Sequence, residues 1–329
     1  MCTRVMWAPP GHPVVSGRNM DWLQDLGTHL WVMRRGAERI GMGPDDANPA
    51  RWTATYGSVV ATGYDFCTTD GINEAGLAAH VLWLAEAEYG DLDIAAPGLS
   101  VGLWAQYYLD RFATVAEAVE AIRTETLAIV PTADPHSGRA ATVHLALGDA
   151  TGDSAIVEYL DGQVTVHHGP TYAVMTNSPP YDQQLELVKA YAGFGGDLPL
   201  PGTTEASDRF VRASYYLQRL PEPRTDREHY AGVLSVMRNV AQPFGEPDPV
   251  RPNISSTIWR TLVDHTNRVY AFESSYSPDI VWVSLDRIDF SHYARLDLTA
   301  DDLTGNVTER FERRDGMYAP LFSPARTLD

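Results

Sequence analysis

The second residue of the chain is a cysteine, and its position at the N-terminus gives it two chemical functions. Once the initiator Met1 is removed, Cys2 carries a thiol nucleophile and a free α-amine on one residue. An α-amine has a pKa of about 7.7–8.0, far below that of a lysine, so it can act as a general base near neutral pH. A nucleophile activated by its own terminal amine is an established route to acyl transfer. A lone cysteine is a weak signal, however, so other residues must support this interpretation.

Arg18 and Asp21 are the first downstream residues that suit such a nucleophile. The amine has to be held in place, which a carboxylate does well, and a nearby guanidinium favours the thiolate. A hairpin through the turn at Pro9–Gly11 would pair the first two strands antiparallel and bring Arg18 and Asp21 level with Cys2. The alternative is a surface ion pair between Arg18 and Asp21, which would contribute little to stability.

Alternating and periodic apolar residues predict the elements that must position these side chains. Strands are predicted over 3–7, 14–19, 30–34, 52–62 and 76–84, and helices over 99–112 and 114–124. The second helix opens on a capping box at Thr114 and Glu117. A meander is predicted over 141–147, 154–160, 163–168 and 172–176, three helices over 180–191, 206–220 and 225–242, and strands over 256–264, 268–273 and 279–285. Runs of strands that alternate with runs of helices favour α+β layers over a βαβ sheet.

Composition and charge limit the class of protein. The chain has 329 residues, of which 44% are hydrophobic and 21% charged, and it shows no repeat or clear linker, so we predict a single domain over 1–329. No apolar run is long enough for a membrane span. The net charge is −18 and no basic stripe stands out, which argues against nucleic acid as a partner.

The N-terminal segment has no basic stretch followed by an apolar one, so no secretory signal is visible. We therefore expect a cytoplasmic protein for the chain as written. If a signal peptide has been removed, a periplasmic or secreted protein is expected instead.

The remaining cysteine and a pair of histidines do not indicate a disulfide framework or a metal site. The chain has two cysteines, and a Cys2–Cys67 disulfide would consume the nucleophile, so we interpret Cys67 as a buried small hydrophobe. His167 and His168 are adjacent on a predicted strand, where successive side chains point to opposite faces, so they cannot easily share one ion. We predict no metal and no cofactor.

Five motifs resemble those of the choloylglycine hydrolase family, and they occur here in the family's order. They are Met1-Cys2-Thr3, Gly17-Arg18-Asn19-Met20-Asp21-Trp22, Asn73-Glu74-Ala75-Gly76-Leu77, Met175-Thr176-Asn177-Ser178-Pro179 and Ser207-Asp208-Arg209-Phe210-Val211-Arg212. The predicted hairpin around 259–272 is also similar. The family comprises bile salt hydrolases, penicillin V acylases and related linear-amide hydrolases, and the resemblance covers most of the chain.

The resemblance implies an N-terminal nucleophile hydrolase fold, an αββα sandwich of two antiparallel sheets between helix layers. It also implies roles by position. Cys2 would be the nucleophile and its α-amine the base, with Arg18 against the thiol and Asp21 on the amine. Asn177 would donate its side-chain amide to the oxyanion, and Arg209 would complete the polar cluster.

Two of these roles have plain alternatives. Asn177 precedes Ser-Pro-Pro and could be a turn residue or a helix cap. Arg209 lies in a predicted helix close to Arg212, and either could be a solvated charge. We prefer Arg209 because it matches the Ser-x-Arg-Phe pattern of the family.

The chain departs from the family at the second oxyanion position, which corresponds to Trp83 where the family commonly has Asn or Tyr. The backbone N–H of Trp83 can donate whatever the side chain, and the indole adds aromatic surface near the scissile bond. The alternative is that Trp83 belongs to the core. The departure resembles a branch associated with Gram-negative bacteria, which includes penicillin V acylases and hydrolases of N-acyl homoserine lactones. We expect an acyl pocket formed by Met20, Trp22, Phe66 and Trp83, with the loops 63–66 and 128–135.

We therefore predict an amide hydrolase that forms a thioester acyl-enzyme on Cys2 after removal of Met1. The expected partner is a small-molecule N-acyl amide such as penicillin V or an N-acyl homoserine lactone, and a conjugated bile salt is the alternative substrate. An acyltransferase, an acid-ceramidase-like amidase and a non-catalytic binder of acyl ligands remain alternative functions. The resemblance also implies a homo-oligomer, a tetramer or a dimer, although the segment between Asn177 and Arg209 is shorter than the assembly segment of bile salt hydrolases.

Overall fold

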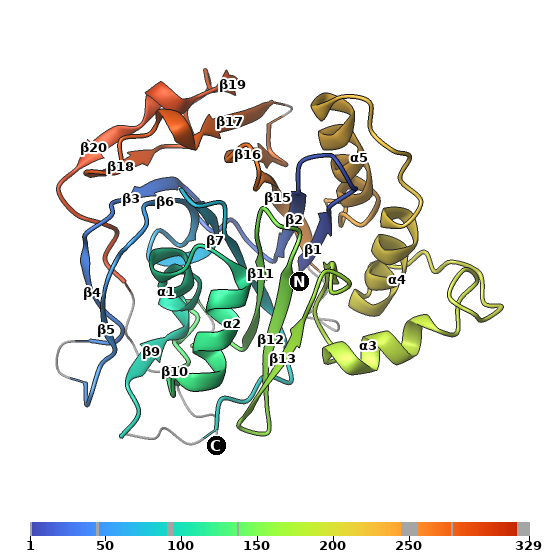
Figure 1. The fold of residues 1–329 in the computed structure, drawn as a ribbon, viewed down its shortest axis with the longest axis horizontal. Coiled ribbons are helices and arrows are strands. Elements are labelled where there is room, and N and C mark those ends of the chain that lie inside the picture. Colours follow the sequence, from blue (N-terminus) through green and yellow to red (C-terminus); the bar gives the residue numbers. More distant parts are fainter. Residues whose placement is uncertain are drawn as a thin grey trace.

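Two β-sheets packed face to face form the centre of the computed structural model, and helices cover both outer faces (Figure 1). The structure describes residues 2–43, 46–90, 95–136, 138–244, 255–277 and 279–320. The layers follow the order helix, sheet, sheet, helix, so the predicted α+β fold with an αββα sandwich is confirmed. Strand β1, which starts at Cys2, is buried within this sandwich.

The seven-stranded sheet carries the N-terminal strand. Its order is β14-β1-β2-β15-β16-β17-β19, and its pairs are antiparallel except for β17 with β19. The strands are β1 (Cys2–Trp7), β2 (Val15–Trp22), β14 (Val174–Met175), β15 (Ser256–Asp264), β16 (Val269–Ser274), β17 (Ile280–Ser284) and β19 (Gly305–Asn306). Arg4 of β1 reaches the other sheet at Ser154, whereas its neighbour Thr3 contacts Arg209 on the helix side. The period-two alternation of a strand therefore sends successive side chains of β1 into different layers.

The nine-stranded sheet has the order β13-β12-β11-β8-β7-β6-β3-β18-β20. Its strands are β3 (Leu30–Met33), β6 (Ser58–Gly63), β7 (Cys67–Asn73), β8 (Ala78–Trp83), β11 (Val143–Gly148), β12 (Ser154–Leu160), β13 (Gln163–His168), β18 (Tyr293–Leu296) and β20 (Glu312–Arg314). The β12–β13 hairpin turns on Asp161 and Gly162, whose φ angles are 49° and 72°. Two positive φ angles match the type I′ turn that suits a two-residue hairpin. Two short pairs lie outside the large sheets, β4 (Glu38–Ile40) with β5 (Arg51–Thr53) and β9 (Gly98–Ser100) with β10 (Ala128–Val130).

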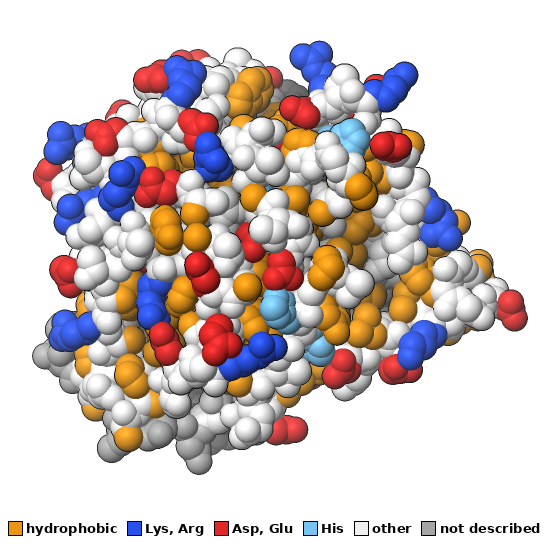
Figure 2. All heavy atoms as spheres, in the orientation of Figure 1, with side chains coloured by type: hydrophobic (Ala, Val, Ile, Leu, Met, Phe, Trp, Pro, Cys, Tyr) orange, Lys and Arg blue, Asp and Glu red, His pale blue; other side chains and the backbone are white. Residues whose placement is uncertain are grey.

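The helices form the two outer layers. Helices α1 (Trp104–Arg111) and α2 (Val115–Thr124) pack on the nine-stranded sheet, and α4 (Ala206–Leu217) and α5 (Asp226–Asn239) pack on the seven-stranded sheet, with α3 (Tyr181–Val188) beside α4. The capping box predicted at Thr114 and Glu117 is confirmed at the start of α2. Within the described ranges, none of the helices combines the length and apolar character that crossing a membrane requires. Figure 2 shows Lys and Arg side chains interspersed with Asp and Glu over one face of the molecule.

Two predicted elements differ from the observed ones, and several observed strands, β7 among them, were not predicted. The single strand expected over 52–62 is wrong, because the chain leaves β5 so that the amides of Thr55 and Tyr56 can bond the Asp110 carbonyl at the end of α1 before β6 begins. The helix expected over 99–112 starts later, after β9 and a 3-10 turn over Val101–Leu103. Strand β7 was not predicted because its sequence, CTTDGIN, is mostly polar, although the sheet buries it.

Candidate active site

Antiparallel pairing sets the start of β1 between two strands that carry predicted site residues. Cys2 lies opposite Met20 of β2, so the predicted pairing of the first two strands is confirmed. Arg4 lies opposite Met175 of β14. Continuing that register past the end of β14 brings Asn177 beside Cys2.

The Cys2 thiol points between the two sheets, where it meets Arg18 and Met20. Nη2 of Arg18 lies 3.5 Å from Sγ, and Sδ of Met20 lies 3.7 Å from it. The same Nη2 donates to the Val81 carbonyl at 2.8 Å, and the guanidinium carbon lies 4.7 Å from the ring centre of Trp259. A fully buried guanidinium therefore lies in contact with the sulfur.

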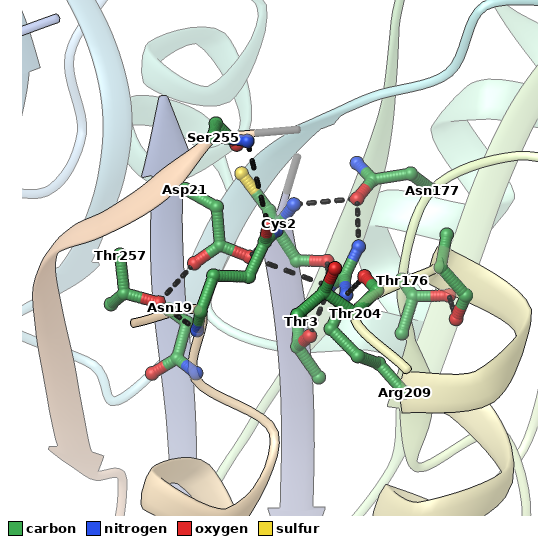
Figure 3. A network of polar contacts seen from close by, with 12 residues as sticks. Cys2, Thr3, Asn19, Asp21, Thr176, Asn177, Thr204, Arg209, Ser255 and Thr257 are labelled. Carbon is green, nitrogen blue, oxygen red and sulfur yellow. Dashed lines mark hydrogen bonds and ion pairs between the residues drawn. The ribbon is translucent and has the colours of Figure 1, made fainter. Parts of the chain in front are cut away.

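The nitrogen of Cys2 becomes the α-amine once Met1 is removed, and it faces Asn177 (Figure 3). It donates to Oδ1 of Asn177 at 2.5 Å, and Nη2 of Arg209 donates to the same oxygen at 2.9 Å. Nδ2 of Asn177 donates to the Trp83 carbonyl at 2.6 Å. Because the amide oxygen meets two donors and the amide nitrogen meets an acceptor, these contacts fix the orientation of the Asn177 side chain.

A buried carboxylate and guanidinium lie on the other face of β1 and β2. Asp21 accepts hydrogen bonds from Thr257 at 2.5 Å and from Gln242 at 3.0 Å, and Nη1 of Arg209 lies 3.5 Å from its Oδ2. Nη1 of Arg209 also donates to the Cys2 carbonyl at 2.5 Å. Burial lowers the pKa of Arg209, and the nearby Asp21 carboxylate opposes that shift. Arg209 and Asp21 thus hold the backbone of Cys2 in place.

The surface ion pair considered for Arg18 and Asp21 is wrong. Both side chains are fully buried, and their spacing along β2 sends them to opposite faces of the strand. Arg212 takes no part in the cluster around Cys2 that these contacts describe. Its Nη1 donates to the carbonyls of Pro201 at 3.1 Å and Thr203 at 2.7 Å, which holds the loop before α4.

Trp83 ends β8, and its backbone carbonyl accepts from Asn177, the residue that also bonds the Cys2 nitrogen. Val143 lies opposite Trp83 on β11, but its N–H donates to the Tyr89 hydroxyl at 2.8 Å. The Val143–Trp83 pair is therefore the type without direct hydrogen bonds, in which the N–H and C=O point away from the partner strand. The carbonyl of Trp83 meets Asn177, and its N–H points to the same side. The indole is half-buried and lies 5.6 Å from the ring of Trp22.

An apolar pocket of about 120 Å³ begins at the thiol. Met20, Trp22, Phe66 and Trp83 all line it, together with the segments that hold Leu26, Tyr64, Val101 and Thr132 to Pro135. An engineered cavity of about 150 Å³ with apolar walls binds one benzene ring. The pocket therefore has room for a single ring or a short acyl chain next to the sulfur.

The Tyr64 hydroxyl ties together three loops at this pocket. It accepts hydrogen bonds from Nε1 of Trp22 at 2.9 Å and Nε2 of Gln24 at 3.1 Å, and it donates to Asp134 at 3.2 Å. The Tyr64 ring stacks on Phe66 with 5.4 Å between centres. Burial raises the pKa of Tyr64 to about 12, so the hydroxyl keeps its proton and remains a donor to Asp134 at neutral pH.

Asp70 supports Arg18 on the side away from the thiol. Oδ2 of Asp70 lies 3.6 Å from Nη1 of Arg18, and the carboxylate also contacts Nδ1 of His80 and the Tyr270 hydroxyl, each at 2.6 Å. All four side chains are fully buried. Burial alone would raise the pKa of Asp70, but His80 and Arg18 outweigh it, so the pKa is below its usual range. Asp70 thus stays anionic beside Arg18.

Ser16 lies between His80 and a second buried histidine, His265. Oγ of Ser16 lies 3.5 Å from Nε2 of His80 and 2.9 Å from Nε2 of His265. Nδ1 of His265 donates to the Gly76 carbonyl at 3.0 Å. Burial lowers the pKa of His80 and brings the pKa of His265 down to about 3, so both rings are neutral near pH 7.

Sequence reasoning missed this buried polar layer, of which Asp70, His80, His144 and Glu158 are members. The available signal was an ionisable residue inside an apolar strand, such as His80 in β8, because such a residue is buried and needs a partner. The partner itself depends on how the two sheets stack, which no local pattern reveals.

Cys67 is not the core residue that the sequence suggested. It is partly exposed and lines the pocket, and its thiol donates to the Gly63 carbonyl at 3.2 Å. Burial of the thiol raises its pKa to about 12, so it remains protonated and unreactive. Both cysteines are free.

The paired histidines of β13 face opposite sides of their strand. His167 lies 3.9 Å from Glu158, whereas Nε2 of His168 contacts Asp153 at 2.7 Å. Among the described residues, no group of three or more His, Cys, Asp or Glu side chains is arranged to hold a metal ion.

The comparisons with known proteins agree with this geometry. A family described as linear amide C-N hydrolases, choloylglycine hydrolase family, matches residues 2–309. A penicillin V acylase of Pectobacterium atrosepticum is 44% identical over 328 residues, covering 92% of this chain and 87% of that protein. The structure of a penicillin V acylase from Agrobacterium tumefaciens has a TM-score of 0.89 at 47% identity, covering 97% of this chain and 99% of that one. A variant of a conjugated bile acid hydrolase from Clostridium perfringens shares the fold, with a TM-score of 0.76 at 19% identity over 90% of this chain and 97% of that one.

Proposed function

Because the chain belongs to the choloylglycine hydrolase family of linear amide C-N hydrolases, we propose that it cleaves N-acyl amides through a thioester on Cys2. The reaction requires Cys2 to be the first residue, so removal of Met1 is the activating step. The amide is a small molecule whose acyl part enters the apolar pocket at the thiol.

In the first half of the reaction the α-amine of Cys2 takes the thiol proton, and Sγ attacks the amide carbonyl carbon. The carbonyl oxygen becomes an oxyanion, which the second N–H of the Asn177 amide and the backbone N–H of Trp83 stabilise. The ammonium then returns the proton to the amide nitrogen, the C–N bond breaks and the free amine leaves. Arg18 stabilises the sulfur while it is negatively charged, at 3.5 Å from Nη2.

In the second half a water molecule attacks the thioester carbon while the α-amine accepts one of its protons. The same two donors stabilise the second oxyanion. The C–S bond breaks, the thiol regains a proton from the ammonium, and the carboxylic acid product leaves. Asp21 and Arg209 hold the Cys2 backbone in register with Asn177 through both halves.

The observation that carries the proposal is that one residue meets all these requirements at once. The Cys2 nitrogen bonds Asn177, its sulfur faces Arg18, and its carbonyl bonds Arg209, all within one buried site at the end of an apolar pocket. A protein that only bound an acyl ligand would have no use for a buried thiol between a basic nitrogen and a guanidinium.

The size and lining of the pocket favour a phenoxyacetyl or short acyl amide. A volume of about 120 Å³ admits one ring, and the half-buried Trp22 and Trp83 offer aromatic surface to it. The two relatives with the highest identities reported above are penicillin V acylases, and penicillin V carries a single phenoxy ring on its acyl group. The four fused rings of a bile salt exceed this volume, so conjugated bile salts are expected to be poor substrates. N-acyl homoserine lactones with short chains fit by the same reasoning.

The test is a panel of amides incubated with protein whose loss of Met1 has been verified by mass spectrometry. Penicillin V, short-chain N-acyl homoserine lactones, a conjugated bile salt and a long-chain N-acyl amide are compared by the rate at which free amine appears. We expect penicillin V or a short acyl lactone to be cleaved fastest, and Cys2→Ala to cleave none of the panel. The proposal is falsified if Cys2→Ala retains the activity of the wild type.

Two further measurements separate hydrolysis from the alternative functions. An added amine acceptor diverts the thioester to a new amide if the protein is an acyltransferase, whereas hydrolysis yields the free acid. Trapping of a mass increase equal to the acyl group on the N-terminal peptide identifies the thioester. The homo-oligomer and the cell compartment expected from the sequence stay predictions.

A further inference from the structure

A buried histidine and glutamate lie directly behind the turn that carries Asn177. His144 belongs to β11 and Glu158 to β12, so both come from the nine-stranded sheet, and both are buried with at most 1% of the residue exposed. Nδ1 of His144 lies 2.9 Å from Oε1 of Glu158, and Nε2 lies 2.9 Å from the carbonyl oxygen of Thr176. Thr176 follows the last residue of β14 in the other sheet and immediately precedes Asn177.

The acceptors on both sides of the ring determine where its protons lie. A carbonyl oxygen only accepts, so Nε2 of His144 must carry a hydrogen toward Thr176. A second hydrogen must then lie between Nδ1 and Glu158. The amide of Tyr181 donates to both oxygens of Glu158, at 3.2 and 3.1 Å, which suits a carboxylate. His144 therefore bridges Glu158 and the Thr176 carbonyl through hydrogen bonds from both sides of its ring.

This pair links the two sheets at the point where the oxyanion donors meet. Trp83 lies on the nine-stranded sheet, whereas Asn177 follows the edge strand of the seven-stranded sheet. The bond from His144 to the Thr176 carbonyl spans that gap. The bond from Asn177 to the Trp83 carbonyl spans it too, but the same amide has to serve the oxyanion during the reaction. The His144 bond does not involve the reacting groups, so it persists through the catalytic cycle.

The rest of the turn is held from α3. Nε2 of Gln184 donates to the carbonyl of Asn177 at 2.6 Å and to that of Pro179 at 2.8 Å. Glu158 accepts the Tyr181 amide at the start of the same helix. Gln184 therefore fixes the turn relative to α3, and the His144–Glu158 pair fixes it relative to Trp83.

We propose that His144, held by Glu158, is a positioning residue that sets the distance between the two oxyanion donors, Asn177 and Trp83. This inference rests on the proposed function, because it assigns His144 to the oxyanion step of that reaction. Removing its bond to Thr176 should lower kcat and leave KM largely unchanged, since His144 itself does not line the acyl pocket. A displacement of about 1 Å in a catalytic group can cost about 10²-fold in rate, so we expect a loss of about 10- to 100-fold.

Two substitutions at one position separate the two bonds of the ring. In His144→Gln the side-chain nitrogen takes the place of Nε2 and can still donate to Thr176, whereas in His144→Asn it takes the place of Nδ1 and reaches only Glu158. We expect His144→Gln to retain kcat within about threefold, and His144→Asn to lose about 10- to 100-fold. His292→Asn, at a partly exposed position in the loop before β18, is the control for loss of a histidine.

The rate at which iodoacetamide alkylates Cys2 distinguishes a lost oxyanion contact from a general structural defect, because only the defect would change this rate. Alkylation builds no oxyanion, so both variants should react at the wild-type rate. Cys67 keeps its proton and does not compete. The proposal is overturned if His144→Asn keeps wild-type kcat, or if its kcat and its alkylation rate fall together.

Nitrogen-15 NMR of the wild-type protein labelled on its histidines tests the bond without any variant that must fold. We expect Nε2 of His144 to carry a proton. Its signals are assigned by their contacts with the Thr176 region, and their absence from His144→Gln checks the assignment. An Nε2 without a proton overturns the proposal. If the Met-trimmed wild type cleaves no amide of the panel, the proposed function fails, while the NMR result still decides whether the link between the sheets exists.

Discussion

Replacing Asn177 by Asp separates the two tasks that the structure gives to this side chain. Oδ1 accepts hydrogen bonds from the Cys2 nitrogen at 2.5 Å and from Arg209 at 2.9 Å, and an aspartate oxygen can accept both. Nδ2 donates to the Trp83 carbonyl and supplies the second N–H for the oxyanion. Asp has nearly the same shape but no N–H, so Asn177→Asp removes the donor and keeps the acceptor.

The expected loss in kcat follows from two contributions. Removal of one oxyanion donor typically costs about 10²–10³-fold in kcat. A carboxylate oxygen at the Nδ2 position also repels the oxyanion, by about 5 kcal/mol for two charges roughly 3 Å apart at an effective dielectric constant of about 20, and Arg209 offsets part of this repulsion. We therefore expect Asn177→Asp to lose at least about 10³-fold in kcat.

The assay is release of free amine from the best substrate of the panel, with loss of Met1 verified for every variant. Asn239→Asp makes the same chemical change at an exposed position near the end of α5 and is the matched control. Thermal unfolding should give a lower midpoint for Asn177→Asp than for the wild type, because the bond from Nδ2 to the Trp83 carbonyl is replaced by two facing oxygens, so the rates are compared well below the midpoint of the variant. A kcat for Asn177→Asp within about threefold of the wild type would refute the oxyanion role and leave Asn177 with the amine contact alone.

Three other outcomes can be measured with the same preparations. An N-terminal extension that turns the Cys2 amine into an amide should lower kcat by at least about 10²-fold, because the general base is lost. Proteolytic removal of the extension, which leaves Cys2 as the first residue, should restore the rate. Activity of the extended protein would exclude the amine as the base. Tyr64→Phe removes the hydroxyl that joins Trp22, Gln24 and Asp134. It should raise KM for a phenoxyacetyl amide about fivefold, with kcat changed less, as expected for a loss of about 1 kcal/mol of binding. An unchanged KM contradicts the role of Tyr64 in shaping the pocket. The free energy of unfolding should fall as the pH drops from about 6.5 toward 3, because the pKa of His265 is about 3 in the folded protein and near 6.5 in the unfolded chain, so the unfolded state binds the proton first. His265→Asn should flatten this part of the curve of unfolding free energy against pH. Equal slopes for the variant and the wild type would argue against this role of His265.

Local sequence patterns were sufficient for the elements that place the nucleophile. The turn at Pro9–Gly11 and the two flanking apolar segments predicted the β1–β2 pairing, and that pairing alone explains why Arg18 reaches the Cys2 thiol. It could not show which layers the side chains of Arg18 and Asp21 enter, because the layers themselves are formed by segments far away in the chain.

Asn177 and Arg209 illustrate a second limit. The resemblance to the choloylglycine hydrolase family picked them out, but no spacing in the sequence indicates that both converge on one oxygen beside the Cys2 nitrogen. That convergence requires β14 to pair with β1 and α4 to pack on the same sheet. Each contact joins residues more than 170 positions apart or crosses from a helix to a sheet, so only the assembled sandwich defines it.

The buried polar layer between the sheets was the least predictable part, and its physical cost explains where it occurs. A buried ion or histidine is expensive unless it is paired, and losing one partner of a buried pair typically costs about 3–5 kcal/mol. Asp70 and Glu158 meet that requirement with His80 and His144, and each pair ends directly behind a functional group, Arg18 in one case and the Asn177 turn in the other. An apolar core could hold the sheets together at lower cost, but it could not orient a guanidinium or a carbonyl oxygen. We therefore expect substitutions in this layer to lower kcat in proteins that still fold. Substitutions that leave one buried partner without the other should also lower the free energy of unfolding.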